Sequence, residues 1–261
     1  MDIIFSPHDY GGGFFSQFNL VMQGLKYYNN NINKVLWNMK DTKVFRYNSG
    51  CIFKILFEEY NSHLQDHEKQ IKIKEFLYSK DTGPYIIDKY HSNDPKWKFD
   101  YNEIYNKYIV HTKYLNQVYN TIYINQLEKY KNIPKIGLLI RNNNLSREQP
   151  NGVMPSLDKY ISAIETLNIN KYILVCAIDN LESLNFFKKN YNIIYNQFIK
   201  RSNNADDIEP HHVNNMRAID GAYHYLESFI LSKSDYLIHP VSNMATAAMY
   251  MNPKIKNIFL Y

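Results

Sequence analysis

The residues best suited to chemistry lie where apolar runs end. The stretch from His8 to Gly13 (HDYGGG) follows the first such run, and its consecutive glycines would let a backbone approach a ligand closely. A helix beginning just after this stretch would add unpaired N–H groups, which favour an anion. The spacing is not the GxGxxG of dinucleotide sites, so a tight turn is the simpler interpretation of Gly12 and Gly13.

Arg141 and Asp179 each follow a longer apolar run directly. Arg141 comes after KIGLLI, where a guanidinium could hold a phosphate through two parallel hydrogen bonds or pair with a surface carboxylate. Asp179 comes after YILVCAI, where its carboxylate could accept hydrogen bonds from a ribose or a base. The more common task of an aspartate at such a point is to cap the next helix, and both interpretations stay open.

A further polar group stands between the run DYLIH and an alanine-rich segment. Ser242, Asn243 and Thr246 offer hydroxyl and amide groups at the beginning of a predicted helix. Together with the N–H groups of a first helical turn, they would make an anion site. An ordinary N-cap accounts for Ser242 but leaves Asn243 unexplained.

Two other motifs invite a metal, and both have simpler explanations. Asp206 and Asp207 lie in the acidic stretch from Asn203 to Glu209, which is typical of a solvated loop. His211 and His212 are adjacent, so on a strand their side chains would point in opposite directions, and no third ligand is apparent. We therefore expect no metal site.

The elements that must position these residues are clearest in the second half of the chain. Strand and helix patterns alternate there with short loops, which is typical of a doubly wound parallel sheet with its ligand at the carboxyl ends of the strands. The expected strands are 135–140, 172–178, 193–195, 236–239 and 255–260, and the expected helices are 156–167, 181–189, 216–231 and 243–251.

The first half opens in a similar way and then becomes less regular. A strand over 2–6, a helix over 14–28 and a strand over 35–39 suggest a βαβ-like unit. Further strands are expected at 52–57 and 71–77, followed by one long helix or two over 102–130. With a boundary near Asn132 to Pro134, we expect two domains, residues 1–132 and 133–261.

The composition limits the class of protein. The 261 residues carry 30 basic and 25 acidic side chains, a mildly basic net charge of +5, and the lysines are spread among acids, which argues against a nucleic-acid partner. A hydrophobic content of 45% excludes a disordered chain. Cys51 and Cys176 stand apart, and no apolar run approaches the roughly 20 residues of a membrane span. We expect a cytoplasmic protein of a reducing compartment.

The second half resembles the α-1,6- and protein O-fucosyltransferase superfamily of GT-B glycosyltransferases. The resemblance covers residues 133–261 well and 1–28 loosely, where GGGFFSQFN takes the place of the family's glycine-rich turn. Two positions depart from the family pattern: Leu139 replaces the His of His-x-Arg, and Ser16 stands before Gln17 where the family has Asn. The segments that carry the resemblance are IGLLIRNNN, MPSLDKYISAIE, ILVCAID and LSKSDYLIHPVSNMATAAMY.

The resemblance implies an α/β, GT-B-like fold, with two Rossmann-like domains whose mainly parallel sheets face a central cleft. The N-terminal domain would bind the acceptor and the C-terminal domain the nucleotide sugar. The implied reaction is the inverting, metal-independent transfer of fucose from GDP-fucose to a glycan or other hydroxyl acceptor. The alternatives are a UDP- or dTDP-sugar as donor, or a non-catalytic module that binds nucleotides or glycans. No cofactor beyond the sugar nucleotide is expected, and a homo-oligomer is compatible with the sequence.

The resemblance also assigns roles to residues. Arg141 would bind the diphosphate of the donor, and Asp179 and Asp220 are both hypothesised to face the nucleoside. The general base would be Asp9 or Glu148, which we rank nearly level, with His8 as a further candidate on the glycine turn. The remaining residues expected to contact the donor are Gly12, Gly13, Ser242, Asn243 and Thr246.

Overall fold

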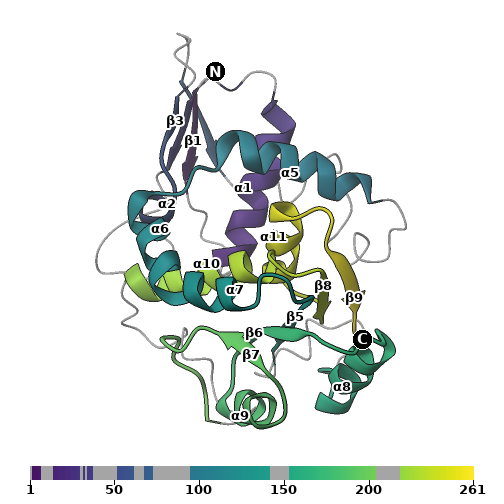
Figure 1. The fold of residues 1–261 in the computed structure, drawn as a ribbon. Helices are drawn as coiled ribbons and strands as arrows, with labels where there is room; N and C mark the ends of the chain where they lie inside the picture. The colour runs from purple at the N-terminus through teal and green to yellow at the C-terminus, as the bar shows by residue number, and fades with distance from the viewer. Residues whose placement is uncertain are drawn as a thin grey trace. The chain divides into compact units, whose positions relative to one another are not determined.

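The computed structural model describes residues 2–6, 14–29, 32, 34–37, 52–61, 68–72, 95–141, 153–203 and 218–261. The chain divides into two compact units, each defined by its own internal contacts. The first unit comprises residues 1–118 and 214–222, and the second comprises 119–213 and 223–261. Figure 1 shows the helices and strands of both.

The first unit contains a four-stranded sheet in the order β3-β2-β1-β4. Its central strand, β1, runs parallel to β2 and β4, whereas β3 pairs with β2 in the antiparallel sense. The helix α1 (Phe14–Tyr28) connects β1 to β2, so the expected βαβ opening is confirmed. The strand bounds are Asp2–Ser6 for β1, Lys34–Trp37 for β2, Tyr60–Asn61 for β3 and Glu68–Lys72 for β4.

The segment expected to form a strand at 52–57 is a helix instead, α2 (Ile52–Leu56). Its buried residues Phe53 and Leu56 are three positions apart and Ile52 and Leu56 are four apart, and a buried helix face satisfies that spacing better than a strand does. Phe53 packs against the rings of Phe14 and Trp37, with centroid distances of 5.2 and 5.4 Å. The expected strand at 71–77 begins earlier, as β4, and its last residues lie outside the described ranges.

Three further α-helices and one π-helical segment follow between residues 95 and 130 of the described chain. The first, α5 (Lys96–Tyr108), packs against α1 and buries Tyr101, Ile104 and Tyr108. The helical stretch expected over 102–130 is interrupted, because the chain is extended at 109–112 and His111 forms a β-bridge with Phe57. The helix resumes as α6 (Lys113–Tyr119), a π-helical segment (Asn120–Ile124) and α7 (Asn125–Lys129). Within the described ranges, no helix is long and apolar enough to cross a membrane.

The second unit is built on a five-stranded, wholly parallel sheet in the order β7-β6-β5-β8-β9. The expected doubly wound parallel sheet is therefore confirmed. The helices α8 and α9 lie on one side of this sheet and α11 on the other (Figure 1). The strands are β5 (Lys135–Ile140), β6 (Ile173–Ile178), β7 (Ile193–Tyr195), β8 (Tyr236–His239) and β9 (Lys256–Phe259). The helices are α8 (Leu157–Thr166), α9 (Leu181–Asn190), α11 (Asn243–Met251) and the greater part of α10 (Ala218–Leu231), whose residues up to 222 belong to the first unit.

The core of the second unit lies around its two central strands. Every residue of β6 is buried, as is every residue of β5 after Lys135. Helices on both faces require strands that are apolar at every position, which is why KIGLLI and ILVCAI read as continuous apolar runs. Cys176 has a free thiol inside this core, and burial raises its pKa, so it behaves as a small apolar side chain.

Gly137 allows β5 and β8 to pack closely. A methyl group at this position would lie 3.1 Å from the Leu237 Cδ1 atom, 3.1 Å from the Ser234 Oγ atom and 3.2 Å from the Tyr236 carbonyl oxygen. The carbonyl belongs to a paired strand and cannot move away easily. We expect Gly137→Ala to lower the free energy of unfolding by about 1 kcal/mol, measured by urea denaturation.

A double variant tests this explanation. The Ser234 hydroxyl is buried and has no hydrogen-bond partner among the described residues, so its removal should cost little. Adding Ser234→Ala to Gly137→Ala should recover part of the loss, because the double variant relieves one of the three close contacts. Strictly additive effects of the two substitutions would contradict the packing explanation.

Candidate functional site

The strand order of the second unit identifies where a ligand would bind. From β5 the chain passes to β6 and β7 on one side and later to β8 and β9 on the other, so the strand order reverses between β5 and β8. In open α/β sheets the carboxyl ends of the strands at this reversal form a crevice that binds ligands. Arg141 follows β5 directly, and Ser242 lies just beyond the end of β8.

Arg141 and Asp179 lie on neighbouring strands at this edge. Ile140 pairs with Ile178, and the Asp179 N–H donates to the Ile140 carbonyl oxygen at 3.3 Å. Both side chains are half-buried. The structure therefore brings together the two residues that the sequence places after its longest apolar runs.

Asp179 does not cap α9. The cap is Asn180, whose Oδ1 atom accepts a hydrogen bond from the Ser183 N–H at 2.8 Å. The capping interpretation of Asp179 is therefore wrong. Asp179 directly follows β6, and the N-cap is the next residue, because α9 begins at Leu181. The Asp179 carboxylate instead accepts a hydrogen bond from the Asn180 side-chain amide at 3.2 Å.

The beginning of α11 is organised by two hydroxyl groups. Ser242 is the N-cap, and its Oγ atom accepts a hydrogen bond from the Met244 N–H at 3.2 Å. Thr246 is buried, and its hydroxyl donates to the Ser242 carbonyl oxygen at 3.3 Å. Asn243, the first helical residue, is half-buried. The two hydroxyls thus stabilise the helix start, and contact of these three side chains with a donor stays a prediction.

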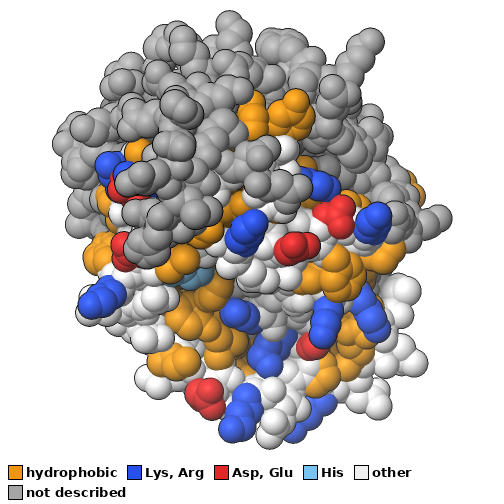
Figure 2. All heavy atoms as spheres, turned by 90° about the horizontal axis from the view of Figure 1, so that it is seen from above, with side chains coloured by type: hydrophobic (Ala, Val, Ile, Leu, Met, Phe, Trp, Pro, Cys, Tyr) orange, Lys and Arg blue, Asp and Glu red, His pale blue; other side chains and the backbone are white. Residues whose placement is uncertain are grey.

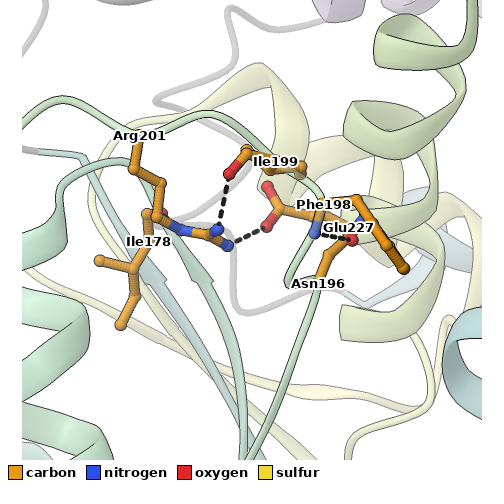
Figure 3. A network of polar contacts seen from close by, with 6 residues as sticks. All are labelled: Ile178, Asn196, Phe198, Ile199, Arg201 and Glu227. Atoms are coloured by element: carbon orange, nitrogen blue, oxygen red, sulfur yellow. Dashed lines mark hydrogen bonds and ion pairs between the residues drawn. The ribbon is translucent and has the colours of Figure 1, made fainter.

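Sequence reasoning missed a buried charged pair beside this edge. Arg201 donates from Nε to the Ile178 carbonyl oxygen at 2.8 Å, from Nη1 to the Ile199 carbonyl oxygen at 3.0 Å, and from Nη2 to Glu227 Oε1 at 3.2 Å (Figure 3). The side chains of Arg201 and Glu227 are only 2% and 6% exposed. The guanidinium is therefore held in the protein interior by three acceptors.

The pair fixes the backbone around Asp179. Ile178, which accepts from Arg201, is the last residue of β6, so the guanidinium is attached to the strand end itself. Ser202, which follows Arg201 in the chain, donates from its N–H to the Asp179 carbonyl oxygen at 3.1 Å. Its own carbonyl oxygen accepts a hydrogen bond from the Leu181 N–H at 2.8 Å. These bonds hold the segment 199–202 against the edge where the candidate site lies.

A signal for this pair was present in the sequence. Glu227 stands in α10 among Tyr225, Leu226 and Ile230, all of which are buried. A charged residue on an apolar helix face needs a buried partner, because an unpaired charge in the interior is costly. The partner could not be named from spacing, since Arg201 lies on a different element.

Burial raises the pKa of Glu227 to about 8, with Arg201 opposing the rise and Asp179 adding to it. Between the ordinary value of 4.5 and this value, the folded protein holds a proton that the unfolded chain has released. We therefore expect the free energy of unfolding to decrease as the pH rises from about 5 to 8. Urea denaturation across this pH range should show the decrease in the free energy of unfolding. The decrease should be smaller in Glu227→Gln, because glutamine cannot ionise. An equal slope in both proteins would contradict the assignment.

Several predicted site residues lie outside the described ranges. They are His8, Asp9, Gly12, Gly13, Glu148, Asp206, Asp207, His211 and His212. Asp220 is described: it is half-buried in the first turn of α10 and belongs to the first unit, whereas Asp179 belongs to the second. Among the residues that the structure describes, no three His, Cys, Asp or Glu side chains gather closely enough to hold a metal ion.

The charged side chains are mixed on the molecular surface. On the face shown in Figure 2, the described Lys and Arg side chains are interspersed with acidic and hydrophobic ones. The distribution agrees with the even spacing of lysines and acids along the sequence.

The fold is similar to that of known proteins, although the sequence is not. No protein-family model matches the chain, and no curated protein matches it. NodZ α-1,6-fucosyltransferase, co-crystallised with GDP, is similar with a TM-score of 0.53 and 12% identity over 97% of this chain and 93% of that one. Fucosyltransferase NodZ from Bradyrhizobium gives a TM-score of 0.52 and 12% identity over 97% of this chain and 94% of that one. The chain has a GT-B-like α/β fold.

Within this GT-B-like fold, the wholly parallel sheet of the second unit is the Rossmann-like half that the sequence predicts most clearly. Its carboxyl edge brings together Arg141, Asp179 and the start of α11. At 12% identity the likeness to NodZ concerns the fold, so the roles of these residues rest on their chemistry.

Proposed function

We propose that this chain is an inverting, metal-independent glycosyltransferase that transfers fucose from GDP-fucose to a hydroxyl group of a glycan. One observation supports the proposal above the others: in a GT-B-like fold, a cation and a helix N-terminus flank the point where the strand order reverses. Arg141 stands on the β5 side of this point, and the capped start of α11 stands on the β8 side.

The proposed reaction requires positive electrostatic potential at the carboxyl ends of β5 and β8. When a sugar leaves a nucleoside diphosphate, negative charge develops on the departing phosphate. The Arg141 guanidinium can bind two phosphate oxygens at once, and the N-terminus of α11 contributes the positive end of its dipole. Groups held in position before the reaction stabilise this charge without reorganisation. Asp179, on the neighbouring strand, would accept hydrogen bonds from the ribose.

The acceptor hydroxyl must lose its proton as it attacks the sugar. A carboxylate within hydrogen-bonding reach of that hydroxyl would serve as the general base. Asp9 and Glu148 are the candidates, as the resemblance implies. Measuring transfer by the Asp9→Asn and Glu148→Gln variants would choose between them.

A thermal-shift screen with GDP, UDP and dTDP tests the donor. A ligand at a hundred times its dissociation constant stabilises the fold by about 2.7 kcal/mol, which corresponds to a rise of roughly 5–10 °C for a protein of this size. We expect GDP to produce this shift and the other two to produce a smaller one. A preference for UDP or dTDP would overturn the fucosyl assignment while leaving a glycosyltransferase.

A second measurement separates an enzyme from a binding module. We expect GDP to be released from GDP-fucose in the presence of glycan acceptors, with inverted configuration at the anomeric carbon of the product. A chain that binds a nucleotide but neither hydrolyses nor transfers sugar from any donor would be a non-catalytic binding module instead.

A further inference from the structure

Tyr160 places a polar atom without a partner close to the candidate site. It lies in the first turns of α8 and packs into the core of the second unit, where its side chain is fully buried. Its hydroxyl has no hydrogen-bond partner among the described residues. Most buried hydroxyls are satisfied by the protein, so this one calls for an explanation.

The charges around the hydroxyl identify its surroundings. Burial raises the pKa of Tyr160, Asp179 raises it further and Arg141 lowers it. Tyr160 belongs to the same buried cluster as Ile140 and Ile178, the paired last residues of β5 and β6 that directly precede Arg141 and Asp179. Because its pKa is raised, the hydroxyl keeps its proton at neutral pH and can donate it to an acceptor.

We propose that the Tyr160 hydroxyl donates a hydrogen bond to a phosphate oxygen of the bound nucleoside diphosphate, beside the Arg141 guanidinium. The inference rests on the proposed function, since it assumes that a diphosphate binds at this edge. Arg141 attracts the anion to this position, and hydrogen bonds to a charged oxygen are stronger than those between neutral groups. A phosphate oxygen of the ligand would thus be the acceptor that the Tyr160 hydroxyl lacks among the described residues.

The Tyr160 side chain is fully buried, so the proposed contact requires neighbouring side chains to move when the phosphates bind. Hydrogen bonds of functional sites are often incomplete before the ligand binds and tighten in the complex. The role is therefore one of binding, and it requires neither proton transfer nor a change of charge on Tyr160.

Tyr160→Phe is the decisive variant, and Tyr123→Phe is its matched control. Tyr123 is also a fully buried tyrosine of the second unit, and its hydroxyl interacts with the Asn196 side chain. The charges that act on it are those of Glu227 and Arg201, not that of Arg141. Without ligand, Tyr160→Phe should unfold at the wild-type temperature or slightly above it, because it loses an unpaired buried hydroxyl. Tyr123→Phe should unfold at a slightly lower temperature, because it loses the interaction with Asn196.

With ligand, the two variants should differ. Isothermal titration should show GDP and inorganic pyrophosphate binding about tenfold more weakly to Tyr160→Phe, and with wild-type affinity to Tyr123→Phe. The pyrophosphate arm distinguishes a phosphate contact from a ribose contact, since pyrophosphate contains no ribose.

The outcomes separate the inference from the proposed function. Wild-type affinity of Tyr160→Phe for both ligands would overturn the inference and leave the proposed function intact. A loss for GDP with none for pyrophosphate would also overturn it, because the contact would then be to the nucleoside. A wild-type chain that binds no nucleoside diphosphate would overturn both.

Discussion

Arg141→Ala should weaken binding of the nucleoside diphosphate about 10- to 100-fold, which is the value of a hydrogen bond between charged groups. Sugar transfer should fall by about a further 100-fold, comparable to the loss of one donor from an oxyanion hole. The reason is that the guanidinium stands at the carboxyl end of β5, beside the point where the strand order reverses, and would interact most strongly with the charge that develops on the leaving phosphate. Titration with GDP and single-turnover transfer measure the two effects separately.

Two further variants sharpen this experiment. Arg141→Lys keeps the charge but loses the planar fork, so it should recover part of the affinity and little of the rate. Lys171→Ala removes one positive charge near the amino end of β6, where the side chain is exposed, and should change neither quantity. Equal losses in Arg141→Ala and Lys171→Ala would show that only net charge matters, and unchanged turnover in Arg141→Ala would refute the donor assignment.

Above pH 8, where the Glu227 carboxyl group is ionised, Glu227→Leu should lower the free energy of unfolding by about 3–5 kcal/mol, because it leaves a buried guanidinium without its anion. The Arg201 guanidinium would then have only the carbonyl oxygens of Ile178 and Ile199 as acceptors. Urea denaturation measures the loss, provided that the slope of the transition is unchanged.

Arg201→Met should lower the free energy of unfolding by less than Glu227→Leu does. In Arg201→Met the remaining carboxyl group can take up a proton, so we expect a smaller loss than in Glu227→Leu. The double variant Arg201→Met/Glu227→Leu should recover most of the stability, since neither charge remains. A Glu227→Leu protein as stable as wild type would show that the pair contributes nothing to the fold.

The parallel sheet of the second unit could be predicted from the sequence because burial on both faces makes its strands apolar throughout. The same criterion failed at 52–57, where a short apolar run is compatible with either a strand or a buried helix turn. Tertiary packing of Phe53 against Phe14 and Trp37 decides that case, and those contacts join residues distant in sequence.

The candidate site was predictable to a similar extent. Arg141 and Asp179 were found because residues after parallel strands share one edge of the sheet. The pairing of Arg201 with Glu227 was not, because it joins a loop to a helix and no regular spacing connects them. Tyr160 was overlooked for a different reason, since a tyrosine on the apolar face of a helix is interpreted as part of the core, and the sequence does not show that its hydroxyl lacks a partner among the described residues.

The position of β8 has a consequence for how the protein is made. The strand joins β5 only after about a hundred intervening residues, and the Lys135 N–H donates at 2.8 Å to the carboxylate of Asp235, which lies just before β8. During synthesis, β5, β6 and β7 emerge from the ribosome before β8. The edge of β5 that pairs with β8 therefore has no partner strand until β8 has been made. The sheet edge that β5 and β8 share therefore does not exist in a nascent chain that ends before Tyr236, and the proposed nucleotide site would be incomplete in such a chain however well its earlier strands have folded.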